Sequence, residues 1–277
     1  MCWMCKAYGE DGKRWYFNPK NHSRQLYTVK RGPKKESAFG TDPETLAGLE
    51  QRRLTAAKWE DPENFPRLLK EYNERPKEGG CQVVPLQEAL QLAEMTYPIA
   101  AMMCICRKMM RADEETNPAE YTCTGLGVGM FKWERWPERY RGGVNIMSLE
   151  EAKEWLTKMD KKGFVHMIMT FGGSYVGGLC NCDYPDCAQI RTRLDYGLEP
   201  ALMKGHHFAK VDYDQCNGCG ICVQRCQFGA IKFEVTVDRT NIDAFRCFGC
   251  GLCETACPRQ AIALVERETV PALKEEW

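Results

Sequence analysis

Two stretches of this 277-residue chain share one pattern: CNGCGICVQRCQFGAI, from Cys216 to Ile231, and CFGCGLCETACPRQAI, from Cys247 to Ile262. Each contains C-x2-C-x2-C-x3-C, and the second copy follows the first at a constant offset of 31 residues. The cysteines, the Cys-Gly pair and the trailing Ala-Ile all superpose. The repeat predicts two copies of one supersecondary unit.

The spacing within each copy suits an iron–sulfur cubane. Three thiolates two residues apart can wrap a tight loop around one cluster, and the fourth lies on the following helix. Glycine lets the backbone approach inorganic sulfide and donate N–H bonds to it. Zinc also takes four thiolates, but its sites usually present two C-x2-C knuckles separated by a longer loop. The pattern favours two [4Fe–4S] clusters. The glycines concerned are Gly218, Gly220, Gly249 and Gly251.

The two runs together resemble the bacterial-type double-cluster ferredoxin domain, with all eight ligand positions filled. The resemblance implies the double-[4Fe–4S] ferredoxin fold, with a pseudo-two-fold repeat. It also implies that each run sends its fourth cysteine to the other cluster. One departure is that Gln227 follows Cys226 where the family has proline, which predicts a looser turn and a shifted potential. The implied ligand sets are Cys216, Cys219, Cys222 and Cys257 for one cluster, and Cys247, Cys250, Cys253 and Cys226 for the other.

Composition narrows the class of protein further. The chain has 17 cysteines, an odd number that cannot all pair, so metal ligation explains them better than disulfides. Lys plus Arg and Asp plus Glu number 38 each, so no overall field attracts nucleic acid. No run approaches the ~20 apolar residues of a membrane span, and the N-terminus lacks a secretory pattern. We expect a cytoplasmic protein that binds no nucleic acid.

Four segments follow from the patterning, and together they predict an α+β protein. Residues 1–80 form a polar, mostly irregular extension with one or two helices, the clearer of which is expected to start at Thr41 or Asp42 and to run to about Trp59. Residues 81–204 alternate helix and strand twice, which predicts a small cysteine-containing α/β domain. Residues 205–266 are the ferredoxin domain, and residues 267–277 are a tail.

Local signals are strongest within the second segment. Ser148 and Glu151 predict a capping box for a helix that Gly163 ends. The stretches YPIAAMMCICRKM and FVHMIMTF read as buried strands. His166, on the latter strand, is expected to be a hydrogen-bonded core histidine. His206 and His207 are expected to be solvated.

Six further cysteines come from four places in this segment. Two C-x-C pairs would each direct both thiols to one face of a strand. Four of the six would complete a third centre, either [4Fe–4S] or zinc. The alternative is that they are ordinary buried thiols, which behave as small hydrophobes. The six are Cys104, Cys106, Cys123, Cys180, Cys182 and Cys187.

The order of these features from Cys81 to Glu266 is similar to a group of iron–sulfur-binding ferredoxin-like proteins of anaerobes. In that group the CNC motif is commonly continued by further cysteines, whereas here Asp183 follows and Cys187 is displaced. Cys2 and Cys5 form a separate C-x2-C knuckle that is two ligands short, which Cys81 or a partner's cysteine could complete.

Three functions remain open from the sequence. The favoured one is a non-catalytic electron-transfer subunit that relays electrons between a soluble donor and a larger oxidoreductase, by analogy a flavoprotein or a tungsten or molybdenum enzyme. The alternatives are a reductase whose extra cluster binds substrate, and a redox sensor or assembly factor. No catalytic residues are identifiable, because paired carboxylates, a nucleophile–base pair and a flavin motif are all missing. The aromatic and basic stretch Phe131 to Gly143 could stack on a base or a flavin, but docking to a protein partner is favoured.

Overall fold

The computed structural model describes most of the chain. The aromatic and basic stretch expected to dock a partner lies outside the described residues, as does the first part of the helix expected between residues 41 and 59. The described residues are 1–10, 12–23, 53–74, 81–104, 106–107, 121–127, 144–170 and 175–277. Among the helices they contain, none combines the length and apolarity that a membrane span requires.

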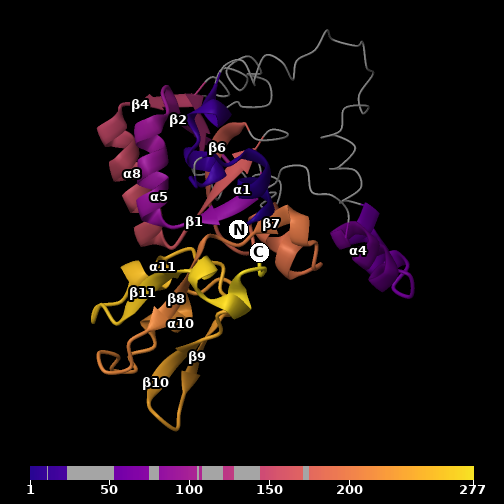
Figure 1. Cartoon of the computed structure of the whole chain (residues 1–277), viewed down its shortest axis with the longest axis vertical. Coiled ribbons are helices and arrows are strands. Elements are labelled where there is room, and N and C mark those ends of the chain that lie inside the picture. Colours follow the sequence, from indigo (N-terminus) through magenta and orange to yellow (C-terminus); the bar gives the residue numbers. More distant parts are fainter. Residues whose placement is uncertain are drawn as a thin grey trace, which may run out of the picture.

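A seven-stranded sheet forms the centre of the larger half of the molecule (Figure 1). Its order is β4-β2-β3-β6-β5-β1-β7, and every neighbouring pair is antiparallel except β1 with β7. The strands are β1 Cys81–Val84, β2 Ile99–Met103, β3 Tyr121–Leu126, β4 Val144–Met147, β5 Val165–Thr170, β6 Val176–Cys182 and β7 Leu202–Met203.

Two helices connect strands that are not neighbours in this sheet. Helix α5, Leu86–Met95, leads from β1 to β2, and helix α8, Leu149–Lys162, leads from β4 to β5. In each case three other strands lie between the two that the helix joins. The helix–strand units expected from the sequence are therefore present, but intervening strands make the sheet largely antiparallel.

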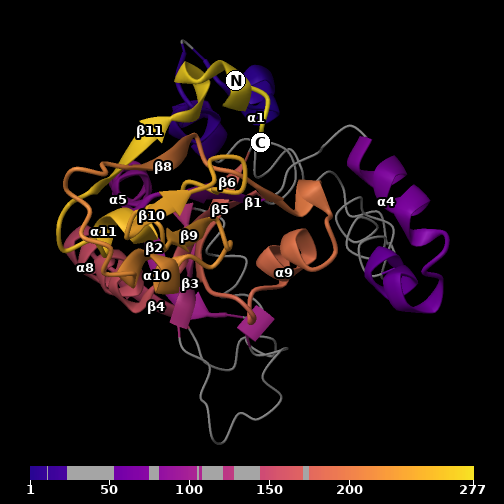
Figure 2. The same cartoon turned by 90° about the horizontal axis from the view of Figure 1, so that it is seen from below.

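Helix α8 has the termini that its sequence predicts. The Ser148 hydroxyl accepts the backbone N–H of Glu151 at 3.3 Å, and the Glu151 carboxylate accepts the N–H of Ser148 at 2.8 Å. Gly163 ends the helix in the left-handed region, at φ 92°. Figures 1 and 2 place α5 and α8 on one face of the sheet and α9, Ala188–Leu194, on the other.

Residues 1–10 and 12–23 contribute several side chains to the core under α5 and α8. They form helix α1, Trp3–Tyr8, and two 3-10 helices, η1 Trp15–Phe17 and η2 Pro19–His22. Trp15 and Tyr16 are fully buried. The Trp15 indole N–H donates to the Gln82 side chain at 2.6 Å, and the Tyr16 hydroxyl donates to Glu88 at 2.6 Å. Farther along, helix α4, Phe65–Glu74, packs by its leucines on a small cluster around Leu198.

The smaller half contains the two cysteine runs. Its strands pair as β8 with β11 and β9 with β10, both antiparallel. Backbone hydrogen bonds repeat at the offset of the sequence: Asp212 N–H to Ala261 and Asp243 N–H to Ala230 both measure 2.8 Å. The elements of this half are β8 His207–Val211, α10 Ile221–Arg225, β9 Ile231–Glu234, β10 Arg239–Ile242, α11 Leu252–Thr255 and β11 Ile262–Glu266, followed by the 3-10 helices η5 Arg267–Thr269 and η6 Pro271–Leu273. A further 3-10 helix, η4 Glu199–Ala201, belongs to the larger half beside α9 and β7.

One apolar core is shared by both halves. Phe228 and Phe248, one from each cysteine run, stack with ring centroids 4.2 Å apart and planes 12° from parallel. Together with Leu252 they pack against the face of the sheet that carries Val165 and Met167. Several cysteines of the larger half lie in this same core, namely Cys81, Cys180, Cys182 and Cys187.

The junction between the halves also depends on one buried arginine. Arg267 is 0% exposed, and its guanidinium donates to the backbone carbonyls of Gly205, Ala244, His207 and Cys247 at 2.7 to 3.3 Å. Burial lowers the pKa of this group from its ordinary value. One side chain thereby fixes the start of β8 against the loop that carries Cys247.

We expect Arg267→Ala to lower the free energy of unfolding by about 3–5 kcal/mol, because four buried carbonyls would lose their charged donor. Urea unfolding of the anoxic protein measures the change. Arg246→Ala, at an exposed position, is the matched control and should stay within about 0.5 kcal/mol of wild type. Equal midpoints for the two variants would contradict the role given to Arg267.

Candidate metal centres

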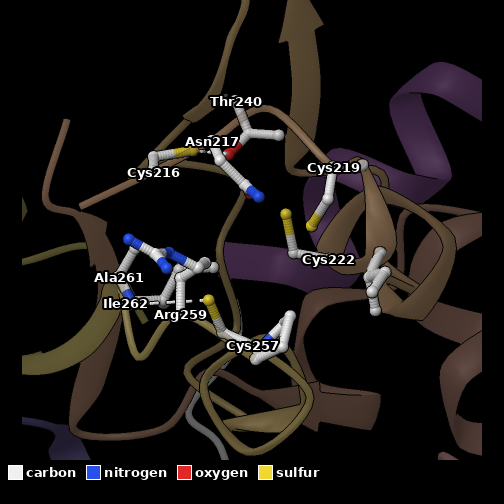
Figure 3. A pocket seen from close by; sticks show the side chains of 12 residues that line it. Cys216, Asn217, Cys219, Cys222, Thr240, Cys257, Arg259, Ala261 and Ile262 are labelled. Carbon is white, nitrogen blue, oxygen red and sulfur yellow. Dashed lines mark hydrogen bonds between the residues drawn. The ribbon is translucent and has the colours of Figure 1, made fainter. Parts of the chain in front are cut away.

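Four cysteines line the first cavity of the smaller half. Cys216, Cys219 and Cys222 come from the first run and Cys257 from the second. Figure 3 shows the sulfurs of Cys219, Cys222 and Cys257 pointing into this cavity, while Cys216 lies beside Thr240. The Cys257 sulfur accepts the backbone N–H of Ala261 at 3.3 Å. Cys219 is exposed, so this cavity lies near the protein surface.

The second cavity has the reciprocal set of cysteines. Cys226 comes from the first run and Cys247, Cys250 and Cys253 from the second. The Cys226 sulfur accepts the N–H of Ala230 at 3.3 Å, the same bond at an offset of 31 residues. The remaining lining is mainly apolar and includes both stacked phenylalanines.

Burial raises the pKa values of Cys247, Cys250 and Cys253. Such thiols stay protonated without a metal, and iron binding must displace their protons. The loop itself needs a close backbone approach at Gly249. Its φ is 71°, and an added Cβ would lie 2.1 Å from the carbonyl oxygen of His207. A side chain at this position would therefore move the loop that carries the cysteines.

Gln227, which stands where the resembling family has proline, anchors the turn after Cys226 to the larger half. Its side-chain amide donates to the Gly163 carbonyl at 2.5 Å and accepts the Tyr184 N–H at 2.8 Å. Both hydrogen bonds cross from the smaller half to the larger one. A looser turn was expected from the sequence, and these bonds restrain it.

Six cysteines of the larger half form one connected group, here called the sheet thiols: Cys104, Cys106, Cys123, Cys180, Cys182 and Cys187. Cys123 and Cys180 face each other across β3 and β6, with their sulfurs 3.9 Å apart. The Cys104 thiol makes hydrogen-bond contacts with Cys106, Cys123 and Cys182. Cys182 also contacts Cys180 and Cys187. Four of the six, Cys104, Cys123, Cys180 and Cys182, therefore close a ring of contacts.

The expectation that Cys104 and Cys106 share one strand is wrong. Strand β2 ends at Met103, and Cys106 and Arg107 are helical. The chain bends after β2, so the two thiols meet through this bend and not through strand alternation. Cys187 is the residue that precedes α9, and it joins the group through its contact with Cys182.

Arg107 neutralises the two aspartates next to the CNC motif. Its guanidinium bonds Asp183 and lies 3.3 Å from Asp186, and its side chain is only 5% exposed. The backbone N–H of Arg107 also donates to the Cys104 sulfur at 3.4 Å. These carboxylates are therefore charge partners of an arginine, and the ligand candidates are the sulfurs.

The sheet thiols have strongly divided pKa values. A hydrogen bond from Cys106 lowers the pKa of Cys104, and one from Cys123 lowers the pKa of Cys180 to about 6. Hydrogen bonds to Cys104 raise the pKa values of both Cys106 and Cys182. Hydrogen bonds from neighbouring thiols thus favour the thiolate forms of Cys104 and Cys180, whereas Cys106 and Cys182 are favoured as neutral thiols.

His166 and His206 are both buried, although only His166 was expected to be. His166 is a fully buried core histidine whose Nδ1 lies 2.5 Å from the Asn181 side-chain oxygen, as expected. The expectation that His206 is solvated is wrong, since it is 3% exposed.

Cys81 lies with the sheet thiols, whereas Cys2 and Cys5 lie in the core under α5 and α8, so Cys81 does not complete their knuckle. His206 lies beside them instead, a neighbour that no local sequence signal identifies.

Comparison with protein families agrees with the two cavities. Residues 215–261 match a family described as the 4Fe-4S dicluster domain. No curated protein matches the chain. The chain therefore contains a ferredoxin-type iron–sulfur segment in its C-terminal part, within a structure of mixed α and β elements. The match supports at least one [4Fe–4S] cluster and electron transfer through it.

Proposed function

We propose that the chain relays single electrons through two [4Fe–4S] clusters, as a subunit between a soluble donor and a larger oxidoreductase of an anaerobe. The observation that carries the proposal is the exchange of cysteines between the two runs. Each cavity takes three cysteines from one run and one from the other. The ligands are Cys216, Cys219, Cys222 and Cys257 at one cluster, and Cys247, Cys250, Cys253 and Cys226 at the other.

A [4Fe–4S] cluster supplies reversible one-electron chemistry when bound. The protein residues set its surroundings. Backbone N–H groups of Ala209, Ala230 and Ala261 donate to ligand sulfurs at 3.3 to 3.4 Å, which favours the reduced state of a cluster by stabilising negative charge. Phe228 and Phe248 exclude water from the second cavity, whereas exposed Cys219 brings the first near a docking partner.

The sheet thiols extend the same proposal to a third [4Fe–4S] centre, held by four of the six. Support comes from their position, because Cys180, Cys182 and Cys187 share one apolar core with the phenylalanines that line the second cavity. A third cluster there would lie next to the second one, and the second next to the first. The chain would then offer a path from the buried sheet to the exposed surface at Cys219.

Zinc is the second candidate for the sheet thiols, and one distance favours it. A tetrahedral zinc with Zn–S bonds of about 2.3 Å holds its sulfurs about 3.8 Å apart. The Cys123 and Cys180 sulfurs are 3.9 Å apart. Zinc would make the centre structural, with no part in electron transfer.

A direct experiment tests the electron-transfer role. The chain, purified without oxygen, is expected to hold about 8 irons for two clusters or about 12 for three, with matching acid-labile sulfide. After reduction, it should pass electrons to a one-electron acceptor such as a cytochrome c in proportion to its iron content. Fewer than about 4 irons, or clusters that a strong reductant cannot reduce, would contradict the proposal.

The same preparation separates the two competing roles. A reductase should turn over a substrate when supplied with a reduced dye, without any second protein. A redox sensor or assembly factor should copurify with a partner whose binding depends on cluster oxidation. A relay should do neither, and should instead link a soluble donor to an oxidoreductase that is inactive without it.

A further inference from the structure

Three buried side chains meet outside the cysteine groups already described. Cys2, Cys5 and His206 place their ligand atoms within 4.8 Å of one another. The His206 Nε2 lies 3.5 Å from the Cys5 sulfur and 3.8 Å from the Cys2 sulfur. The exposed fractions are 0% for Cys2, 6% for Cys5 and 3% for His206. Residues far apart in the sequence thus present two sulfurs and one imidazole nitrogen to a common point.

These distances fit one tetrahedral metal ion. With Zn–S bonds of about 2.3 Å and a Zn–N bond of about 2.0 Å, a thiolate sulfur lies about 3.5 Å from the imidazole nitrogen. The two observed separations, 3.5 and 3.8 Å, agree with that value within a few tenths of an ångström. The C-x2-C spacing of Cys2 and Cys5 is also that of a zinc knuckle.

The surroundings of both sulfurs suit bound thiolates. The backbone N–H of Cys5 donates to the Cys2 sulfur, and the N–H of Trp15 donates to the Cys5 sulfur, both at 3.4 Å. Such donors orient thiolate ligands and stabilise their charge. Aromatic rings enclose the imidazole, since Tyr16 and Trp277 lie with ring centroids 5.7 and 5.2 Å from that of His206.

Hydrogen bonding alone explains this arrangement less well. His206 Nε2 faces both sulfurs but carries at most one proton, so it can donate to only one of them. The second sulfur would keep its weak backbone donor and a hydrogen bond with the first thiol, and neither of these contacts uses the imidazole nitrogen that faces it. A metal ion interacts with all three ligand atoms at once.

We propose that Cys2, Cys5 and His206 bind one Zn²⁺ ion, with water at the fourth position. A ligand set of two cysteine thiolates and one histidine imidazole is a known type of zinc site. An iron–sulfur cubane is a poorer match, because it takes four thiolates and this group offers two.

The ion would join the N-terminal segment to the junction between the halves. Cys2 caps helix α1, and His206 lies between strands β7 and β8. The backbone N–H of Arg267 donates to the His206 carbonyl at 2.7 Å, so the site adjoins the buried arginine of the junction. In both views α1 lies beside the last residues of the chain (Figures 1 and 2). This role is independent of the electron-transfer proposal.

Metal analysis of the full chain, purified without oxygen and with its clusters intact, tests the site. We expect His206→Ala to lose about one equivalent of zinc relative to wild type while its iron content stays unchanged. His207→Gln is the matched control. The adjacent histidine faces Glu88 and Glu266 at 3.4 and 3.2 Å, so its replacement should leave zinc in place.

A second measurement does not depend on how the variants fold. X-ray absorption at the zinc edge of the wild-type protein should show sulfur and imidazole scattering together, and the sheet thiols contain no imidazole that could imitate it. The proposal is overturned if wild-type protein from zinc-supplemented cells holds no zinc. It is also overturned if its zinc shell lacks imidazole, or if His206→Ala retains all of its zinc.

Discussion

Replacing Cys226 with serine is expected to remove the cluster of the other cysteine run. Cys226 belongs to the first run, yet it lines the second cavity with Cys247, Cys250 and Cys253. The expected loss is about 4 irons per chain, because a [4Fe–4S] cluster that misses one thiolate is poorly retained. Cys257→Ser should remove the first cluster by the same reasoning.

Double variants show which cysteines share one cluster. Cys226→Ser combined with Cys247→Ser should lose no more iron than either single variant, because both residues serve one cluster. Cys226→Ser combined with Cys216→Ser should lose both clusters, or about 8 irons. Iron and sulfide analysis measures the losses, and electron paramagnetic resonance of the reduced protein should lose the interaction between the first and second clusters in each single variant. The reverse pattern of iron losses would show that each run ligates its own cluster.

The second large effect is expected at the sheet thiols. Wild-type protein should hold about 12 irons, and Cys104→Ser combined with Cys182→Ser should leave about 8, because this pair removes half of the contact ring. Cys81→Ser is the matched control. Cys81 lies in the same apolar core and acts on Cys180 and Cys187 by charge alone, so its replacement should leave the iron content unchanged.

Zinc analysis of the same samples separates the alternatives for this centre. About 8 irons in wild type, with zinc that disappears in the double variant, would replace the third cluster by a structural zinc. About 8 irons with no such zinc would mean that the sheet thiols are ordinary core residues. Either result would leave the expectation for Cys226 untouched, because that residue serves a separate cavity.

Local sequence signals predicted much of the secondary structure but not the sheet topology. Helix α8 follows directly from Ser148, Glu151 and Gly163, because caps act within one turn. The sheet order depends on helices α5 and α8 crossing over three strands, which no local pattern encodes. Strand β2 stops at Met103 although apolar residues continue, so hydrophobicity alone placed the strand end too late.

The candidate metal residues divide in the same way. The spacing of the cysteine runs is local, and the structure arranges those eight residues around two cavities. The sequence also singled out the six sheet thiols, but not the salt bridges by which Arg107 engages Asp183 and Asp186. His206 was missed, because a lone histidine has no motif and its neighbours Cys2 and Cys5 lie at the other end of the chain.

The stacked pair Phe228 and Phe248 limits how this protein can be divided. The double-cluster segment reads in sequence as a module that could be cut out at residue 205 and grafted elsewhere. Excision would carry both rings and Leu252 into water, at about 1.5–3 kcal/mol for each side chain, and would create an apolar patch prone to aggregation. The sheet therefore covers apolar side chains that the double-cluster segment cannot bury by itself. We expect the two parts to be inherited, expressed and engineered together.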